Sequence, residues 1–367
     1  MNDPTYSSDF PAQSANTMQS AFPTQNAAPM QSAFTEQAVN PMQSGGAPKG
    51  HNAARPASPI QFEIKNPRAR EAMARLAPVL HGKDDVLLRL LVCVFAGGHL
   101  LLEDLPGLGK TTLALAASRL LGLRFGRVQC TNDLLPTDIT GVSVYKADSG
   151  QFQFHAGPVF SNLLLVDEIN RATPKTQSAL LEAMGEEQVT VDGRTYALPK
   201  PFFVIATQNP VENAGTFPLP ESQMDRFMIK TSIGYPPRED ERRILRLGPQ
   251  KGDFASFQPM FTPDEIVAQQ QQLEHGIRAD DRILDYILDL VERTRVHPLL
   301  AGGISPRGGM MILRVARVLA WLAGRDYVTP EDIRLLAMEV WGHRLQARRG
   351  TSGSGVLQSI LDETPIP

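Results

Sequence analysis

Hydrophobic and polar positions divide this chain into two successive patterns. Three apolar runs, at residues 100–102, 162–166 and 201–207, show little polar alternation, which is typical of strands buried on both faces of a parallel sheet. From residue 262 onward the apolar residues instead recur at helical spacing, as in the stripe formed by Ile283, Ile287, Leu290 and Val291. The pattern predicts an α/β core over residues 59–236 and a C-terminal α-helical lid domain over residues 237–367.

Turn and capping residues add detail to this outline. Residues 142–154 alternate around Asp148-Ser149-Gly150, and residues 188–196 alternate around Asp192-Gly193, so each segment is expected to form a β-hairpin. The segment Thr262-Pro263-Asp264-Glu265 combines an N-cap, a first-position proline and acidic first-turn residues, which together predict a helix start. One more strand is expected over residues 227–233.

The N-terminal segment differs in composition from the rest of the chain. Residues 1–58 are rich in Ala, Gln, Ser, Asn, Pro and Thr, and Met-Gln-Ser recurs at Met18, Met30 and Met42. Such a composition buries too little apolar surface to offset the entropy of ordering, so we expect a disordered tail. The repeats are either a motif that docks a partner or a low-complexity sequence without a role, and composition favours the second.

A glycine-rich segment that follows the first apolar run is the most specific motif. Gly107 and Gly109 let backbone N–H groups approach an anion, and a helix N-terminus is expected directly behind them. In such a loop a lysine reaches the phosphates and the next hydroxyl ligates Mg²⁺, roles that fall on Lys110 and Thr111. Asp104 stands where the motif usually has its first glycine, and aspartate tolerates turn conformations. The expected nucleotide-binding set is Asp104, Leu105, Pro106, Gly107, Leu108, Gly109, Lys110, Thr111 and Thr112.

Polar residues end the other two apolar runs. Asp167 and Glu168 follow the second run, at the carboxyl end of a strand, where open α/β sheets bind ligands. Alone, an Asp-Glu pair is more typical of a surface turn, but the glycine-rich loop favours a functional role. Asp167 is then expected to hold Mg²⁺ together with Thr111, while Glu168 polarises the attacking water. Asn209 follows the third run and is expected to orient the same water.

Two arginines complete the set of candidate catalytic residues. Arg226 precedes the strand expected at residues 227–233, and Arg307 precedes a helix. Isolated arginines are most often solvated surface charges. Arg226 could also pair with Asp225 or Glu221 of its own chain, so neither arginine has an assigned role from its position alone.

Taken together, these motifs resemble the MoxR family of AAA+ ATPases. The resemblance covers residues 64–367 and rests on the glycine-rich loop and on segments 96–103, 132–141, 157–172, 175–184, 206–210, 305–307 and 342–345. It implies a homo-oligomeric ring, expected to be a hexamer, that binds ATP and Mg²⁺ at its subunit interfaces. Arg226 then acts as an arginine finger on a neighbour's ATP, and Arg307 is a sensor-2 residue that reports the nucleotide to the lid. The two hairpins are implied to face the centre of the ring.

Composition excludes several other classes of protein. The 367 residues carry a net charge of −3, without the basic excess of a nucleic-acid-binding surface. The two cysteines, Cys93 and Cys130, make no disulfide framework and lack metal-ligand spacing, so we expect buried thiols in a reducing cytoplasm. The longest apolar stretch, residues 86–102, is interrupted by polar residues and too short for a membrane span, and no signal peptide is evident.

The expected function is ATP hydrolysis that drives remodelling, maturation or activation of partner proteins. The resemblance also implies a von Willebrand factor A-type partner. Two alternatives stay open: a metal-chelatase motor subunit with the same ATPase parts, and a nucleotide-bound assembly scaffold with little turnover. The scaffold is disfavoured because Glu168, Asn209 and Arg226 are all present. A DNA helicase or a transcriptional activator is less favoured because the sequence lacks a helix-turn-helix signal, a zinc site and a basic bias.

Overall fold

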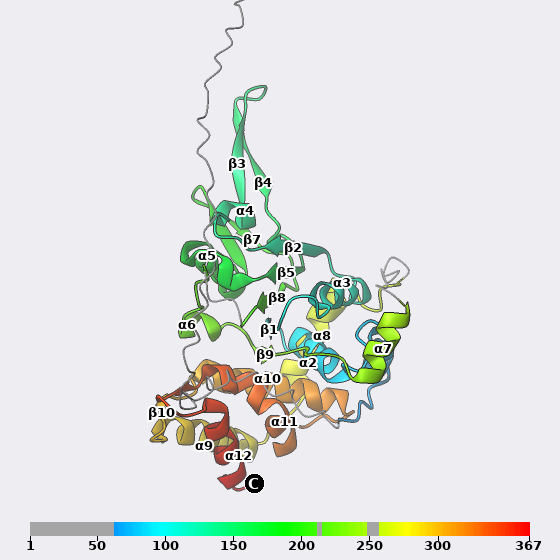
Figure 1. Ribbon diagram of the computed structural model, residues 1–367, viewed down its shortest axis with the longest axis vertical. Coiled ribbons are helices and arrows are strands. Elements are labelled where there is room, and N and C mark those ends of the chain that lie inside the picture. The colour runs from blue at the N-terminus through cyan, green and yellow to red at the C-terminus, as the bar shows by residue number, and fades with distance from the viewer. Residues whose placement is uncertain (1–61, 211–214, 248–256) are drawn as a thin grey trace, which may run out of the picture. The chain divides into compact units, whose positions relative to one another are not determined.

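The computed structural model describes residues 62–210, 215–247 and 257–367 (Figure 1). The expected tail with its Met-Gln-Ser repeats lies outside the described residues. The strands are β1 Leu100–Glu103, β2 Phe125–Gln129, β3 Gly141–Lys146, β4 Gln151–Ala156, β5 Leu163–Asp167, β6 Gln188–Val191, β7 Arg194–Ala197, β8 Phe203–Gln208, β9 Ile229–Thr231, β10 Leu300–Gly302 and β11 Gln346–Ala347. The helices are α1 Pro67–Leu76, α2 Asp84–Phe95, α3 Lys110–Leu120, α4 Pro136–Thr140, α5 Pro174–Glu186, α6 Glu221–Met224, α7 Arg238–Leu247, α8 Pro263–Gly276, α9 Asp281–Val296, α10 Pro306–Leu322, α11 Pro330–Trp341 and α12 Gly353–Glu363.

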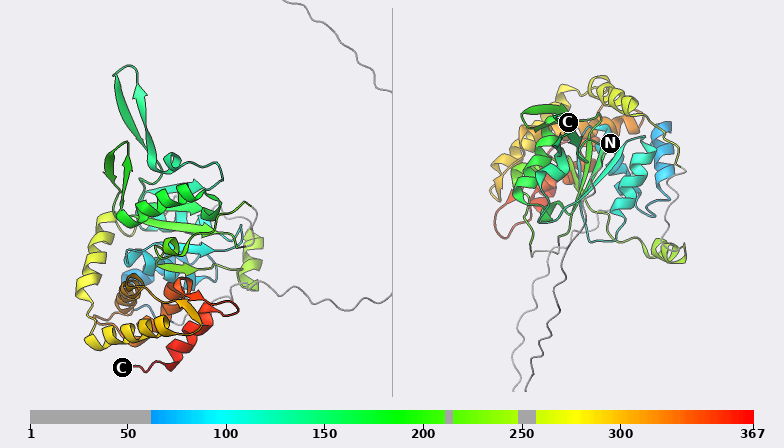
Figure 2. Two further views of the ribbon diagram at one scale, coloured as in Figure 1. Left: turned by 90° about the vertical axis from the view of Figure 1, so that its left-hand side faces the viewer. Right: turned by 90° about the horizontal axis from the view of Figure 1, so that it is seen from above.

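A five-stranded parallel sheet forms the centre of the α/β core, in the order β2-β5-β8-β1-β9. Side chains alternate between its faces, so Leu100 and Leu102 pack on one side while Leu101 packs on the other. Helices α1, α2 and α3 cover the first face and α5 covers the second (Figure 2). The sequence prediction of an α/β core with a parallel sheet is confirmed.

Strand β9 is shorter than the expected strand 227–233. The N–H groups of Met228 and Ile229 bond to the carbonyl of His99, which starts the pairing with β1. Past Thr231 the chain leaves the sheet, and Gly234 adopts a left-handed backbone with φ +65°. The N–H groups of Ile233 and Gly234 instead donate to the carboxylate of Asp104. A side-chain acceptor therefore replaces the sheet as the partner of these backbone groups.

Both expected hairpins are present. Strands β3 and β4 pair antiparallel, as do β6 and β7, and the two hairpins lie near each other at one end of the core (Figure 2). Asp192 and Gly193 both have positive φ, the backbone that a tight two-residue hairpin turn requires. Phe154 of β4 stacks on Tyr196 of β7 with ring centroids 4.2 Å apart, so an aromatic contact joins the hairpins.

The lid consists mainly of α8 to α12. Thr262 caps α8 as expected, and it does so through reciprocal bonds with Glu265, at 3.3 Å and 2.9 Å. Apolar residues of α9 to α12 belong to the same buried cluster as one face of the sheet, so the lid and the core share a continuous interior. A fully buried guanidinium, that of Arg89 in α2, also joins them by bonding Glu339 of α11 at 2.8 Å. None of the described helices is long and apolar enough to cross a membrane.

Candidate nucleotide-binding site

The sequence-predicted site residues on three strand ends meet around one cavity. Its volume is about 360 Å³, and it lies at the carboxyl ends of β1, β2, β5 and β8. Lys110 and Thr111 enter from the start of α3, while Asp167 and Glu168 enter from the end of β5. The lining residues are Pro106, Gly107, Gly109, Lys110, Thr111, Thr112, Arg127, Gln129, Asp167, Glu168, Thr207 and Asn209.

The glycine-rich loop has the backbone that close approach of an anion requires. Gly107 and Gly109 have φ values of +85° and +87°, which disfavour any residue with a Cβ. No atom lies within 4 Å of the position that a Cβ on Gly107 would occupy, so this side of the loop is open. Helix α3 begins at Lys110, and its free N–H groups and dipole favour a phosphate there.

Lys110 is held at the cavity by its own loop. Its Nζ donates to the main-chain carbonyl of Asp104 at 2.6 Å. Burial lowers the pKa of Lys110, and the charges of Asp104, Asp167 and Glu168 oppose that shift. The ammonium group is therefore partly desolvated and held by a main-chain carbonyl, which a bound polyphosphate could replace as its partner.

Asp104 has a structural role at the position where such a loop usually has its first glycine. The carboxylate accepts hydrogen bonds from the N–H groups of Ile233 and Gly234, the latter at 3.0 Å. Burial raises the pKa of Asp104, and these two hydrogen bonds act against that rise. Asp104 thus ties the base of the phosphate loop to the segment that leads from β9 into α7. Sequence reasoning assigned Asp104 to the loop but missed this second contact.

The acidic residues have distinct environments. Asp167 Oδ2 pairs with Arg127 at 2.9 Å, and Oδ1 accepts from the Thr207 hydroxyl at 3.4 Å. Glu168 has a left-handed backbone with φ +56°, a conformation that non-glycine residues adopt mainly at functional sites and turns. Its N–H donates to Thr207 at 2.9 Å, and its carboxylate pairs with Arg171 at 3.1 Å. The turn therefore directs two adjacent carboxylates into one cavity.

Oxygen donors suited to Mg²⁺ are present at this position. The Thr111 hydroxyl and the Asp167 carboxylate both line the cavity, and Mg²⁺ prefers such ligands while retaining several waters. Asn209 lines the cavity too and is 7% exposed. Arg127, Gln129 and Thr207 are lining residues that sequence reasoning missed, because a lone Arg or Thr on a strand carries no motif.

Arg226 and Arg307 do not reach this cavity. His99 precedes β1 and Gly185 lies near the end of α5, so both mark the amino edge of the sheet, whereas the cavity lies at the carboxyl edge. The guanidinium of Arg226 packs so closely on Gly185 that an added Cβ would lie 1.5 Å from Nη1. Burial lowers the pKa of His99 to about 4, and the positive charges of Arg307 and Arg226 contribute to this shift. The four residues of β1 alone span about 13 Å, so both arginines are remote from the cavity of their own chain.

Arg344 of the lid holds the segment around Arg226. Its Nε donates to Asp225 Oδ1 at 2.8 Å, and its Nη2 donates to the carbonyl oxygens of Asp225 and Phe227 at 3.2 Å and 2.5 Å. The carboxylate that could have paired with Arg226 is therefore bound to Arg344. Among the described residues no carboxylate forms an ion pair with Arg226, although Asp225 and Glu221 are its sequence neighbours.

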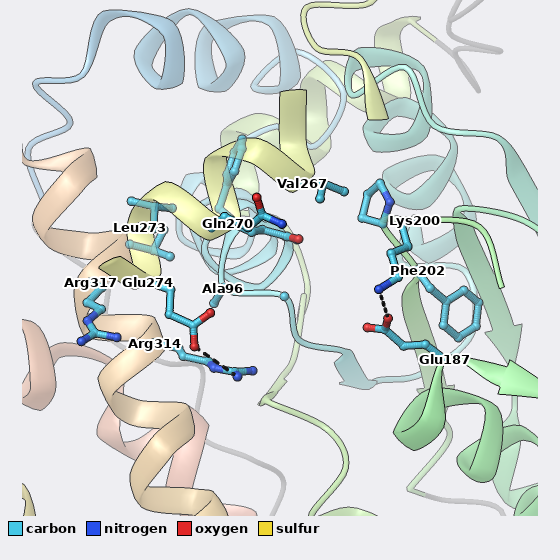
Figure 3. A pocket seen from close by; sticks show the side chains of 15 residues that line it. Ala96, Glu187, Lys200, Phe202, Val267, Gln270, Leu273, Glu274, Arg314 and Arg317 are labelled. Atoms are coloured by element: carbon cyan, nitrogen blue, oxygen red, sulfur yellow. Dashed lines mark ion pairs between the residues drawn. The ribbon is translucent and has the colours of Figure 1, made fainter. Parts of the chain in front are cut away.

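A second cavity, of about 220 Å³, is formed by residues of α8, α10 and the amino edge of the sheet (Figure 3). Four of its five charged residues lie in opposing pairs, with Glu187 3.3 Å from Lys200 and Glu274 3.8 Å from Arg314, and the fifth is Arg317. None of the candidate nucleotide-binding or catalytic residues lines it. The chemistry that the motifs predict is therefore confined to the first cavity and the two remote arginines.

Comparison with known proteins assigns the chain to a family. Residues 99–229 match the ATPase family associated with various cellular activities (AAA), and residues 292–363 match the AAA lid domain. The chaperone MoxR1 of Mycobacterium tuberculosis is 41% identical over 287 residues, which cover 75% of this chain and 74% of that protein. This chain belongs to the MoxR family of AAA+ ATPases. The family resemblance inferred from sequence is thereby confirmed.

Other MoxR-like proteins agree over most of their length. YeaC of Bacillus subtilis, an uncharacterized protein, is 42% identical over 310 residues, which cover 83% of this chain and 97% of YeaC. The crystal structure of a candidate ATPase from Cytophaga hutchinsonii superposes with a TM-score of 0.76 at 36% identity, covering 82% of this chain and 95% of that one. The magnesium-chelatase subunit ChlI of Nicotiana tabacum is more distant, at 29% identity over half of this chain and 43% of its own.

Proposed function

We propose that this MoxR-family chain hydrolyses ATP with Mg²⁺ in a ring of its own copies, expected to be a hexamer in the cytoplasm. The observation that carries the proposal is the single cavity that the glycine-rich loop shares with Asp167, Glu168 and Asn209. Phosphate-binding N–H groups, a metal-binding carboxylate and a water-activating carboxylate are the parts that ATP hydrolysis needs.

Each residue at the cavity has a proposed role. Lys110 binds the β- and γ-phosphates, and Thr111 and Asp167 hold Mg²⁺, which neutralises charge that develops on the phosphates. Glu168 accepts a proton from the attacking water, and Asn209 orients that water. The Glu168–Arg171 ion pair must loosen first. It is partly exposed and therefore worth little, so the loosening is easily offset by substrate contacts.

The catalytic site is proposed to be completed by a neighbouring subunit. Arg226 has no carboxylate partner among the described residues and lies at the edge of the sheet remote from its own cavity. This placement supports an arginine finger that acts on the ATP of a neighbour, a contribution of about 10³–10⁵ in rate. Ser305, two residues before Arg307, donates to the carboxylate of Asp225, the residue before Arg226. Arg307 is proposed to read the same neighbouring nucleotide, which couples that nucleotide to the lid.

The work done by the ring is proposed to be chaperone-like remodelling, maturation or activation of partner proteins, including one with a von Willebrand factor A-type domain. A similar relative is named a chaperone, and this supports the proposal. A chelatase motor subunit is the second candidate, supported only by half-length similarity to ChlI. A scaffold with little turnover is third, and a full set of hydrolytic residues argues against it.

Two substitutions test the hydrolytic assignment. Lys110→Ala removes the cation that faces the phosphates, so binding of ATP is expected to weaken. Glu168→Gln keeps that cation but removes the base, so ATP is expected to bind normally while turnover falls by about 10²–10⁴-fold. Phosphate release and fluorescent-nucleotide binding measure the two effects separately. Glu168→Gln turnover equal to that of the wild type would refute the role of Glu168.

A further inference from the structure

Helix α7 presents an exposed basic stripe, in which Arg242 also pairs with the exposed Glu239 of the same helix at 3.1 Å. Arg238, Arg242, Leu245 and Arg246 occupy positions i, i+4, i+7 and i+8, which lie on one face of a helix, and all four are exposed. Leu245 is 79% exposed, which is unusual for a leucine in a helix with strong polar and apolar sides. A partner that covered this face would remove its leucine from water.

Helix α9 of the lid presents the acidic counterpart at the same spacing. Asp281, Asp285, Leu288 and Asp289 again occupy positions i, i+4, i+7 and i+8, and all four are exposed, Leu288 by 52%. The opposite face of α9 is buried in the lid, so the stripe belongs to a well-anchored helix. The nearby Arg282 and Arg278 form ion pairs with Asp280 and Asp326, and therefore not with the carboxylates of the stripe.

The two stripes lie on opposite sides of the described core and lid. Figure 1 and the view from above in Figure 2 both place α7 on one side and α9 on the other. Two complementary surfaces so placed cannot meet within one chain. They can meet between copies in a head-to-tail contact, and a repeated head-to-tail contact generates a ring when the rotation closes.

Each stripe also lies beside one part of the proposed shared catalytic site, which consists of the phosphate loop of one copy and the two arginines of its neighbour. Three residues before α7, the carbonyl of Tyr235 accepts from Lys83, and the neighbouring Ile233 and Gly234 bind Asp104 at the base of the phosphate loop. At the other stripe, Arg295 of α9 donates to the carbonyl of Ile304 at 2.9 Å, just before the start of α10, whose first turn carries Arg307. Docking α9 of one copy on α7 of the next would therefore bring the remote arginines toward a neighbour's cavity.

We propose that the basic stripe of α7 docks on the acidic stripe of α9 of a second copy of this chain and that this contact closes the ring. The inference rests on the proposed ring function and adds to it the two surfaces that hold neighbours together. Charge complementarity sets the order and orientation of the copies, and burial of Leu245 against Leu288 removes both leucines from water.

Charge reversal provides the test. One protein carries Arg242→Glu and Arg246→Glu, and a second carries Asp285→Arg and Asp289→Arg. Each alone places like charges face to face, so the subunit concentration for half-assembly with Mg²⁺ and a slowly hydrolysed ATP analogue is expected to rise roughly tenfold or more. Sedimentation velocity measures it. Exposed residues outside the stripes give matched controls, Arg70→Glu with Arg349→Glu and Glu63→Arg with Glu363→Arg, which should assemble like the wild type.

Mixing the two charge-reversed proteins gives the decisive result. The acidic α7 of the first then faces the basic α9 of the second, and both remaining stripes are unchanged, so alternating copies should assemble and only even-numbered rings should close. A wild type that assembles while the reversed proteins assemble equally well would overturn the contact and leave the ring intact. Loss of assembly without rescue on mixing would also overturn it. A wild type that stays monomeric would overturn both the contact and the proposed ring.

Discussion

The buried arginine between α2 and α11 allows a stability prediction with a magnitude. Arg89 is fully buried and donates to Asp85 at 2.5 Å and to Glu339 at 2.8 Å, while those side chains keep 22% and 13% exposure. Replacing Arg89 with Met retains volume but leaves two carboxylates without their cation. Removing one partner of a buried pair costs about 3–5 kcal/mol, and the residual exposure of both acids places this case near 3 kcal/mol.

Urea unfolding followed by circular dichroism tests this estimate. With a slope of about 3 kcal/mol/M, a loss near 3 kcal/mol lowers the midpoint by about 1 M. The triple variant Arg89→Met, Asp85→Asn, Glu339→Gln removes all three charges and should recover most of the loss, because no uncompensated carboxylate remains. An Arg89→Met midpoint indistinguishable from that of the wild type would refute the estimate that this network stabilises the contact between core and lid.

Three further outcomes are expected. Asp104→Gly should raise hydrogen exchange at Ile233 and Gly234 while Asp104→Asn, which keeps an acceptor, should change it less; equal exchange in both would contradict the tie to the phosphate loop. The pKa of His99 is lowered to about 4 in the folded state, so the neutral ring stabilises the fold at pH values above 6.5. This stabilisation, about 3 kcal/mol of unfolding free energy, is lost as the pH falls toward 4. A His99→Phe variant should lack this part of the acid sensitivity, and a pH profile equal to that of the wild type would contradict the prediction. Arg226→Ala mixed with Lys110→Ala should regain ATPase activity that neither has alone and lose it on dilution, whereas an arginine acting within its own chain predicts no gain.

Short local segments of the sequence were sufficient to predict much of the fold and the residues of the glycine-rich loop and of the Asp167-Glu168 pair. The turn at Asp192-Gly193 and the cap at Thr262 each depend on a few adjacent residues, and both are present as expected. The glycine-rich loop and the Asp167-Glu168 pair likewise carry their meaning in short segments. The side chains of Arg127 and Thr207 reach Asp167 only through the pairing of strands that are far apart in sequence.

Long-range packing determined what sequence could not indicate. The second contact of Asp104 depends on where β9 ends, since Ile233 and Gly234 bond to it only after leaving the sheet. The position of Arg307 depends on how the lid packs on the core, which no periodicity reveals. The matched stripes of α7 and α9 were also inaccessible, because equal spacing becomes meaningful only when both faces are exposed on opposite sides.

The attachment of the first described residues has a practical consequence for tethering this protein. The N–H groups of Lys65 and Asn66 both donate to the carbonyl of Leu322 at the end of α10, and Thr364 is buried beside the last helix. The chain thus joins the lid at both ends of its described core. A bead, surface or optical handle linked through residues near 65 or 364 would pull on the lid. The hairpins at the far end of the core would carry no attachment, so force could be applied to the lid without obstructing them.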